Sequence, residues 1–221
     1  MTKSTDVPPA RPRRKSGGFP PARTEEILDA ATELFAEHGY SDAVTAALAE
    51  RLQVGKGTLY RYFPSKRDLF LAAADRVMRR LRECVDNRTS DIIDPIARIR
   101  ESLFAFLAFF EEHPKYAELL IQERALFKDR AKPTYQVHRE ANAVRWHETY
   151  RALIAEGRVR DVPVERIIDV FSDLAYGTVF TNYYTGRRKP LEAQARDILD
   201  VVFHGILTEP EGRRQAGGGR P

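Results

Sequence analysis

Prolines and glycines divide most of this chain into segments of helical length, and this spacing limits the possible folds more than any other feature. Between about residues 23 and 208, apolar residues recur every three or four positions, and the alternation typical of a half-buried strand is scarce. Proline rarely continues a helix, and glycine often follows the last helical residue, so these residues mark helix boundaries. The sequence therefore predicts an all-α protein.

About nine helices are expected from these boundaries. Ser65 with Asp68 three positions later forms a capping-box pattern, and Asp94 followed by proline is the preferred order at a helix start. Thr24 is the expected cap of the first helix and Gly39 its expected stop. The expected ranges are 24–38, 43–50, 56–62, 65–87, 94–113, 114–127, 133–156, 163–185 and 190–207.

The composition excludes several classes of protein. Among the 221 residues, Cys84 is the only cysteine, so an internal disulfide and a multi-cysteine metal site are excluded. The longest strongly apolar run, residues 103–110, is too short to span a bilayer. No apolar segment follows the basic N-terminal residues, as a secretory signal would require. We therefore expect a cytoplasmic protein with no membrane partner.

Positive charge is concentrated in the N-terminal third. Residues 7–23 and 51–67 each contain five basic residues and no acidic residue, whereas the whole chain has a net charge of only +4. This distribution suggests a polyanionic partner, although charge runs are also common on solvated surfaces. Residues 1–22 contain paired prolines and glycines and are expected to be a flexible basic arm, and the glycine-rich residues 209–221 a disordered tail.

Residues 54–70 read VGKGTLYRYFPSKRDLF, a composition that neither a simple amphipathic helix nor a strand explains. Two short helices joined by a tight turn, within a three-helix unit rich in basic residues, are typical of a helix-turn-helix. The second short helix of such a unit enters the major groove of DNA. Gly55 and Gly57 would let its backbone approach phosphate, and Lys56 and Thr58 would contact base edges or phosphates.

The other aromatic and basic residues of this segment are expected to pack against the protein, to contact DNA, or to do both. The rings of Tyr60 and Tyr62 can pack against the unit while their hydroxyls donate to phosphate, and Arg61 lies between them. Lys66, on the first turn of the next helix, can reach the flanking DNA backbone. A helical hairpin that binds nothing is the alternative. A phosphate-binding loop at the GKGT sequence is excluded because the earlier glycine that this motif requires is absent.

The sequences TEEILDAATELFAEHGY and LAERLQVGKGTLYRYFPSKRDLF resemble the tetracycline-repressor (TetR) family of transcriptional regulators. The resemblance covers about residues 23–70, and the remainder is similar in helical layout and length. It implies a TetR-type DNA-binding domain over residues 23–69 and a helical ligand-binding and dimerisation domain over residues 70–208. It also implies DNA contacts at a set of positions in the first of these domains. These are Lys56, Thr58, Tyr60, Tyr62 and Lys66. The candidate DNA-binding residues also include Thr45, Gly57 and Arg61.

Two positions depart from the family pattern. The family often has glycine in the turn where this sequence has Gln53, which must either adopt a left-handed conformation at a cost of about 1 kcal/mol or shift the turn. The family tends to place threonine where this sequence has Val44, whose side chain cannot bind phosphate. Thr45 follows one place later, and Asp42 or Ser41 is the expected cap of the second helix.

The run LFAFLAFF at residues 103–110 is apolar on every side, so its helix must be buried on every side. One side can belong to the core and another can line a cavity for an apolar or aromatic ligand, as the family resemblance implies. Plain core packing is the alternative for each of these aromatic residues. The candidate pocket residues are Phe106, Phe109, Phe110, Phe127, Trp146, Tyr150 and Phe180.

The last two helices carry the candidate dimer interface. The range 190–207 has a wide apolar stripe, and the range 163–185 has small residues that permit close approach of a second helix. The interface candidates are Val170, Leu174, Thr178, Ile198, Val202 and Ile206.

The expected function is a DNA-binding transcriptional regulator, a repressor that binds a palindromic operator in double-stranded DNA as a homodimer. A small-molecule effector would release it by shifting the population towards a wrongly spaced dimer. No nucleophile motif, dinucleotide fingerprint or metal cluster is present, and His138 and His147 are nine residues apart, a poor ligand spacing. We therefore expect no catalytic residue, metal or cofactor. The alternative is an architectural DNA-binding protein that responds to no ligand.

Overall fold

The computed structural model describes residues 20–186 and 189–205, and within these ranges it contains nine α-helices and no strand. The predicted all-α class is confirmed. The bounds are α1 Pro21–Asp42, α2 Thr45–Arg51, α3 Lys56–Tyr62, α4 Lys66–Thr89, α5 Pro95–Glu112, α6 Pro114–Leu126, α7 Thr134–Ala155, α8 Val164–Thr185 and α9 Leu191–His204. Most of the expected arm (1–22) and the whole expected tail (209–221) lie outside the described residues.

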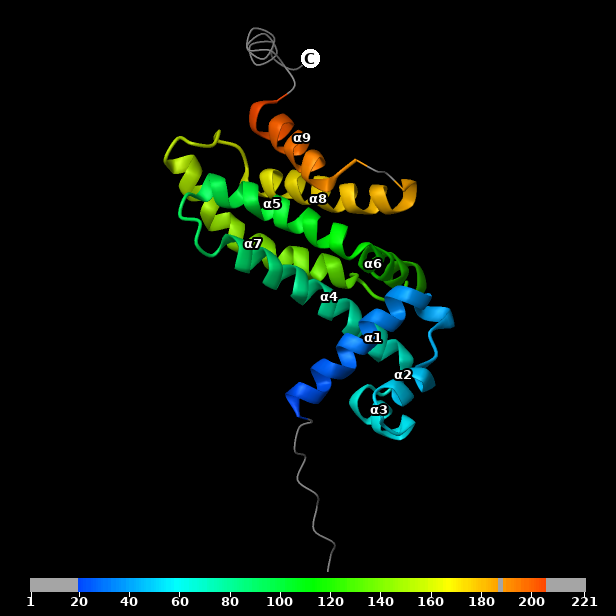
Figure 1. Cartoon of the computed structure of the whole chain (residues 1–221). Helices are drawn as coiled ribbons and strands as arrows, with labels where there is room; N and C mark the ends of the chain where they lie inside the picture. Colours follow the sequence, from blue (N-terminus) through cyan, green and yellow to red (C-terminus); the bar gives the residue numbers. More distant parts are fainter. Residues whose placement is uncertain (1–19, 187–188, 206–221) are drawn as a thin grey trace, which may run out of the picture.

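The three N-terminal helices form one end of the molecule, and the remaining helices form a bundle (Figure 1). Helix α4 connects the two parts because it packs against α1 at one end and against α5 and α7 in the bundle. Helices α8 and α9 lie on the far side of the bundle from α3 (Figure 1). The expected domain boundary at residues 69 and 70 falls inside α4, so no loop separates the two parts.

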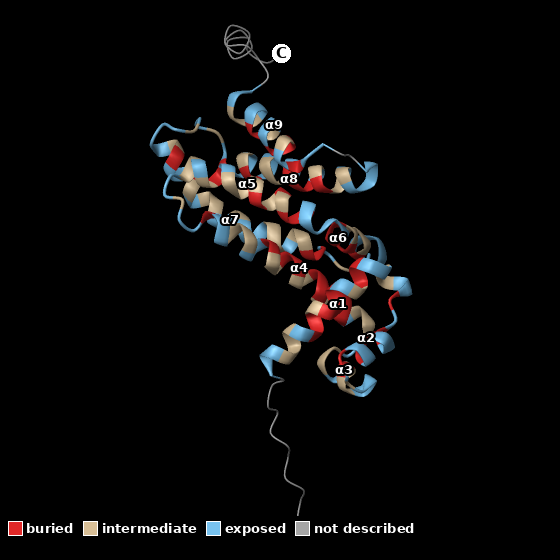
Figure 2. Ribbon diagram, viewed as in Figure 1, coloured by how far each residue is buried: buried red, intermediate tan, exposed pale blue. Residues whose placement is uncertain are grey.

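A continuous hydrophobic core runs from the N-terminal helices into the bundle. Phe35 of α1 and Phe70 of α4 are fully buried, with ring centroids 5.0 Å apart in an edge-to-face arrangement. The same cluster of buried residues continues through Leu107 of α5 and Leu119 of α6 to Leu199 of α9. Figure 2 shows buried residues, in red, on α1, α4, α5 and α6. Shared burial therefore holds the N-terminal helices to the bundle.

Two predicted helix caps are confirmed. The Ser65 hydroxyl accepts a hydrogen bond from the Asp68 backbone N–H at 3.0 Å, and the Asp94 carboxylate accepts one from the Ala97 N–H at 2.8 Å. Hydrogen bonds from Arg158 and from the backbone at Ala97 lower the pKa of Asp94. These caps fix where α4 and α5 begin, and α4 is the helix that both parts of the molecule share.

The first two helices differ from the prediction at their ends. Helix α1 begins at Pro21, and not at a Thr24 cap, because the Pro20 carbonyl accepts the first backbone hydrogen bonds and proline suits the first helical position. Gly39 has a left-handed φ of 70° and kinks the chain, but helical residues continue to Asp42. Helix α2 has Val44 at its N-cap and no side-chain cap, so the expected cap from Ser41 or Asp42 was wrong.

Gln53 adopts the left-handed conformation in the turn between α2 and α3, with φ 52°. It is the only non-glycine residue with positive φ among the described residues. Its N–H donates to the Glu50 carbonyl at 2.9 Å, and the Val54 N–H donates to the Ala49 carbonyl at 2.9 Å. The turn between α2 and α3 therefore does not shift, and Gln53 bears the strain of the left-handed backbone conformation.

Replacing Gln53 with glycine should stabilise the protein. We expect Gln53→Gly to raise the free energy of unfolding by about 0.5–1 kcal/mol, because relief of the left-handed strain exceeds the extra entropy of an unfolded glycine. Ala47→Gly, on exposed helical backbone of α2, is the control and should lower the free energy of unfolding by about 1 kcal/mol. Urea denaturation measures both, and an unchanged or lower stability of Gln53→Gly would contradict the strain.

Candidate functional site

Helix α3 is held to the rest of the N-terminal unit by one deeply buried side chain. Leu59 is 1% exposed and belongs to the same core cluster as Leu48 of α2 and Phe35 of α1. A hydrogen bond of 3.0 Å between the hydroxyls of Thr45 and Tyr60 also joins α2 to α3. These contacts fix α3 against α2, with the surface opposite Leu59 turned outwards.

Thr45 was expected as a DNA contact, but the structure places it largely inside the protein. Its side chain is 7% exposed, and its hydroxyl is engaged by Tyr60. The side chain thereby positions Tyr60, and no surface of Thr45 is offered to a large partner. This correction follows from its place at the first turn of α2, beside α3.

The N-terminal tip of α3 is open. Gly55 and Gly57 are exposed, have ordinary negative φ values, and would tolerate an added Cβ because nothing lies within 4 Å of its position. The fold of this chain therefore does not require glycine at either position. The exposed ammonium of Lys56 is 6.0 Å from the centroid of the Tyr60 ring, and Thr58 beside it is half-buried. The tip combines open backbone with a positive charge.

The remaining predicted contacts lie at the other end of α3 and on α4. Arg61 is exposed and Tyr62 is half-buried on the last turn of α3. Lys66 is engaged within the protein, because its ammonium donates to the Ser41 carbonyl at 3.0 Å and lies 4.9 Å from the centroid of the Tyr40 ring. Figure 1 shows α3 at the end of the molecule that is farthest from α8 and α9.

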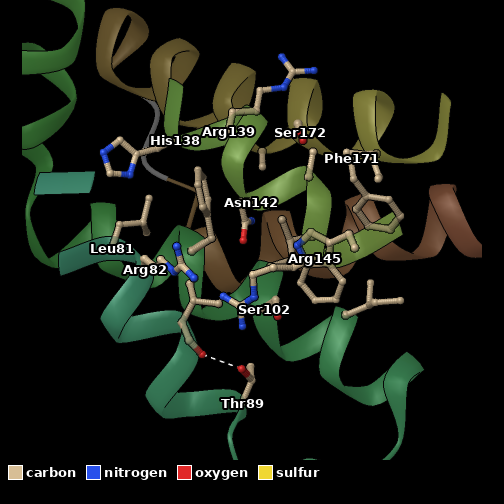
Figure 3. Close-up of a pocket in the computed structure, with 18 of the residues that line it drawn as sticks. Leu81, Arg82, Thr89, Ser102, His138, Arg139, Asn142, Arg145, Phe171 and Ser172 are labelled. Carbon is tan, nitrogen blue, oxygen red and sulfur yellow. Dashed lines mark hydrogen bonds between the residues drawn. The ribbon is translucent and has the colours of Figure 1, made fainter. Parts of the chain in front are cut away.

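A cavity of about 290 Å³ lies between helices α4, α5, α7 and α8. Figure 3 shows side chains from these helices around it. Of the predicted pocket residues, Phe106, Trp146 and Tyr150 line this cavity. Burial raises the pKa of Tyr150, so its phenol stays protonated at neutral pH.

The other four predicted pocket residues do not line this cavity, so that part of the prediction was wrong. Phe127 packs against Tyr40 and Phe70 at the junction of the two parts, with ring centroids 5.2 and 5.6 Å away. Phe109 and Phe110 are buried in the core, and Phe180 packs against Tyr135. A helix that is apolar on every side has several buried faces, and the sequence pattern does not separate them.

Sequence reasoning missed the charged residues of the cavity. An arginine on a helix is usually expected on the solvated surface, and no spacing pattern in the sequence distinguishes the arginines that face a cavity. Four arginines, one aspartate and one histidine line the cavity. They are Arg82, Arg98, Arg139, Arg145, Asp86 and His138.

A chain of polar contacts leads from the cavity to the N-terminal unit. The His138 Nε2 lies 2.7 Å from an Asp75 carboxylate oxygen, and the Arg79 Nε donates to the other oxygen at 2.9 Å. Arg79 in turn lies 3.5 Å from Glu25 of α1. Neighbouring Arg76 binds the same glutamate at 2.5 Å. Side chains of α4 therefore connect the cavity lining to α1.

The predicted interface positions form a partly exposed apolar surface. Val170 and Leu174 of α8 are exposed, and Thr178, Ile198 and Val202 are half-buried. Ile206 lies outside the described residues. Val201 of α9 adds a further exposed apolar side chain that the prediction omitted.

Two searches of the described residues concern other kinds of site. No group of three or more histidine, cysteine, aspartate or glutamate side chains within the described ranges is arranged to hold a metal ion. No helix in the part of the chain that the structure describes is both long and apolar enough to cross a membrane.

Residues 27–73 match the model of the family described as bacterial regulatory proteins, tetR family. The match covers the helix-turn-helix, including α3 and its open tip. The N-terminal unit of the chain is therefore similar in sequence to the DNA-binding region of the TetR family. The matched region ends within α4, so this comparison does not describe the bundle that holds the cavity.

Known proteins support the same assignment. The nucleoid occlusion factor SlmA of Vibrio campbellii is 32% identical over 108 residues, which cover 48% of this chain and 55% of SlmA. The chain spans about half the length of the curated relatives it matches.

Among solved structures, the fatty acid degradation regulator FadR of Bacillus halodurans has a TM-score of 0.71 at 17% identity and covers 86% of this chain and 98% of its own. FadR of Bacillus subtilis, solved in complex with stearoyl-CoA, has a TM-score of 0.68 at 18% identity and covers 83% of this chain and 99% of its own. At these identities the likeness establishes the fold of this chain.

The open tip of α3 generates a prediction in which stability and DNA affinity change in opposite directions. Gly57→Ala should raise the free energy of unfolding by up to about 1 kcal/mol, because alanine favours helix and meets no neighbour. The same variant should weaken specific DNA binding, because the added methyl separates α3 from the duplex. Thermal denaturation and fluorescence anisotropy on a duplex selected from a random pool measure the two effects. Equal affinity of variant and wild type would contradict close approach at this glycine.

Removing the positive charge at the tip should also weaken binding. Lys56→Ala should lower affinity for the selected duplex by about tenfold or more, and loss of a phosphate contact would reduce the salt dependence of binding. Lys115→Ala, which removes the same charge from an exposed position on α6, should leave the affinity unchanged. Equal losses in the two variants would indicate a general charge effect and no specific role for Lys56.

Proposed function

We propose that this chain is a TetR-family transcriptional regulator, non-enzymatic and DNA-binding, that places α3 in the major groove. The observation that carries the proposal is the tip of α3, where two exposed glycines that the fold does not need stand beside Lys56. Open backbone next to a cation suits a phosphate-lined groove. Arg61, Tyr62 and the Tyr60 hydroxyl, which Thr45 positions, are further proposed contacts.

The proposed functional unit is a homodimer that binds a palindromic operator. The exposed Val170 and Leu174 on α8 support the proposal, together with Val201 on α9, because side chains of this kind gain from burial against a second copy. Two recognition helices related by a two-fold axis would contact successive major grooves about 34–36 Å apart. Half-sites one helical turn apart are therefore expected in the operator.

A charge in this surface should separate the protomers. Leu174→Arg should convert the dimer to a monomer in sedimentation equilibrium, because an arginine would be buried without a partner. Binding to a duplex with two half-sites should weaken as the dimer is lost. Val144→Arg, at an exposed apolar position on α7, is the matched control and should remain dimeric. A Leu174→Arg protein that stays dimeric would place the interface elsewhere.

The proposed role is repression, with release from the operator when a small molecule occupies the cavity. The contacts from His138 through Asp75 and Arg79 to Glu25 support a coupling between the cavity and α1. A ligand-independent architectural protein is the second candidate, favoured by the partial similarity to a nucleoid occlusion factor. The cavity and its polar link to α1 favour the regulated form.

Cutting this polar link should weaken the coupling without abolishing either binding event. Asp75→Ala should reduce the effector-induced loss of operator affinity by about 2- to 30-fold. Asp169→Ala is the control, because Asp169 binds the cavity residue Arg139 from α8 and has no contact with α1. Anisotropy titrations with and without an effector found by thermal-shift screening give the coupling. If Asp75→Ala responds as wild type does, the signal takes another route.

A further inference from the structure

The cavity lining contains more positively charged side chains than negatively charged ones. Arg145 lies 2.8 Å from an Asp86 oxygen and Arg82 lies 3.5 Å from the other, so two guanidinium groups share one carboxylate. Arg98 also lines the cavity, and it forms no ion pair or side-chain hydrogen bond with any described residue. This side of the cavity, formed by α4, α5 and α7, therefore carries a surplus of positive charge.

A buried hydroxyl beside this charge also lacks a partner. The Ser102 oxygen is buried and makes no hydrogen bond to any described residue, and Ser102 lies one helical turn after Arg98 on α5. A buried hydroxyl without a partner costs about 1–3 kcal/mol, which a ligand oxygen could recover. Asn142 of α7 also lines the cavity and has no side-chain hydrogen bond within the described ranges. Figure 3 shows Ser102, Asn142, Arg82 and Arg145 in the central part of the cavity view.

Two groups of aromatic side chains also line the cavity. The ring centroid of Tyr150 lies 6.4 Å from those of Trp146 and Phe171, and the Phe106 and Tyr176 rings meet edge to face at 5.1 Å. Burial raises the pKa of Tyr176 as it does that of Tyr150, so neither phenol adds negative charge at neutral pH. The volume of about 290 Å³ is at the low end of the range of about 300–1,000 Å³ usual for ligand pockets.

We infer that the cavity binds an amphipathic anion: an apolar chain of medium length, or a small ring system, that carries a carboxylate or phosphate group. Arg98 and the Ser102 hydroxyl bind the anionic group, with Asn142 as a further donor, and the aromatic side chains enclose the apolar part. This refines the predicted apolar or aromatic ligand by adding an anion. The inference that this anion is the effector rests on the proposed function, whereas the inference that the cavity binds it does not.

The arrangement differs from a chance cluster of surface charge in two respects. A solvated arginine needs no partner, but the Ser102 oxygen is buried and makes no hydrogen bond to any described residue, and a ligand oxygen or an internal water would satisfy it. Arg139, the fourth arginine of the lining, is already held by Asp169 at 3.1 Å and Asp173 at 2.7 Å. The unsatisfied groups therefore gather on one side.

Matched acids and alcohols test the anionic group directly. Isothermal titration calorimetry of the full chain, without DNA, is carried out with decanoate against 1-decanol and with 2-naphthoate against 2-naphthol. In at least one pair the acid should bind about tenfold or more tightly than the alcohol, because hydrogen bonds to charged groups are stronger than neutral ones. Decanoyl-CoA is the third arm, and preference for it over decanoate would assign the anion to a phosphorylated headgroup.

Variants on α5 locate the anionic group. Arg98→Ala should weaken binding of the preferred acid or thioester by about tenfold or more, and Ser102→Ala should weaken it by a smaller factor. Arg100→Ala removes the same charge two residues away, outside the cavity lining, and should bind as wild type does. Circular dichroism melting of each variant separates loss of binding from loss of fold.

The inference is overturned if neither acid nor the thioester binds, if the alcohols bind as tightly as the acids, or if Arg98→Ala binds as Arg100→Ala does. Operator binding of the free protein is measured separately by anisotropy. A chain that binds the acid but no specific duplex would overturn the proposed regulator function and leave the cavity assignment standing. A chain that binds its duplex but no anion would overturn the cavity assignment and leave the proposed regulator function standing.

Discussion

The packing of α4 against α1 is the interaction on which the rest of the structure depends. Phe35 and Phe70 form its fully buried centre, and outside them the carboxylates of Glu25 and Asp29 bind arginines of α4. Arg80 binds Asp29 at 2.5 Å and also donates to the Tyr116 hydroxyl of α6 at 3.2 Å. An apolar centre with a polar rim gives both adhesion and a fixed register. The orientation of α3 relative to the bundle is set by this contact.

Helix α4 has a second role because its other faces belong to the bundle. Met78 and Leu81 are buried in the core and also line the cavity, and Arg82 and Asp86 on the same helix carry its charges. A helix that forms the wall of a cavity and the support of a second unit transmits small displacements as a rigid body. The continuity of α4 through residues 69 and 70 is therefore mechanically important, although the sequence suggested a boundary there.

The helices and several of their caps could be predicted because they depend on local signals. Ser65 and Asp94 act at the helix starts where the sequence placed them, and the strain expected at Gln53 is present. The features that could not be predicted depend on which helix faces pack against each other. Phe127 and Phe106 look alike in the sequence, yet one joins the two parts and the other lines the cavity. Likewise, nothing local distinguishes the cavity residue Arg98 from the outlying Arg100.

The backbone kink at Gly39 matters for joining the N-terminal unit to a different bundle. A side chain at this position would meet the Gln122 amide of α6 at 2.7 Å, and that same amide accepts a hydrogen bond from the Tyr40 N–H at 2.7 Å. The end of α1 is therefore fitted to one particular side chain far along the chain. A chimera that joins this N-terminal unit to a different bundle would lose the Tyr40–Gln122 hydrogen bond unless it also carries this part of α6.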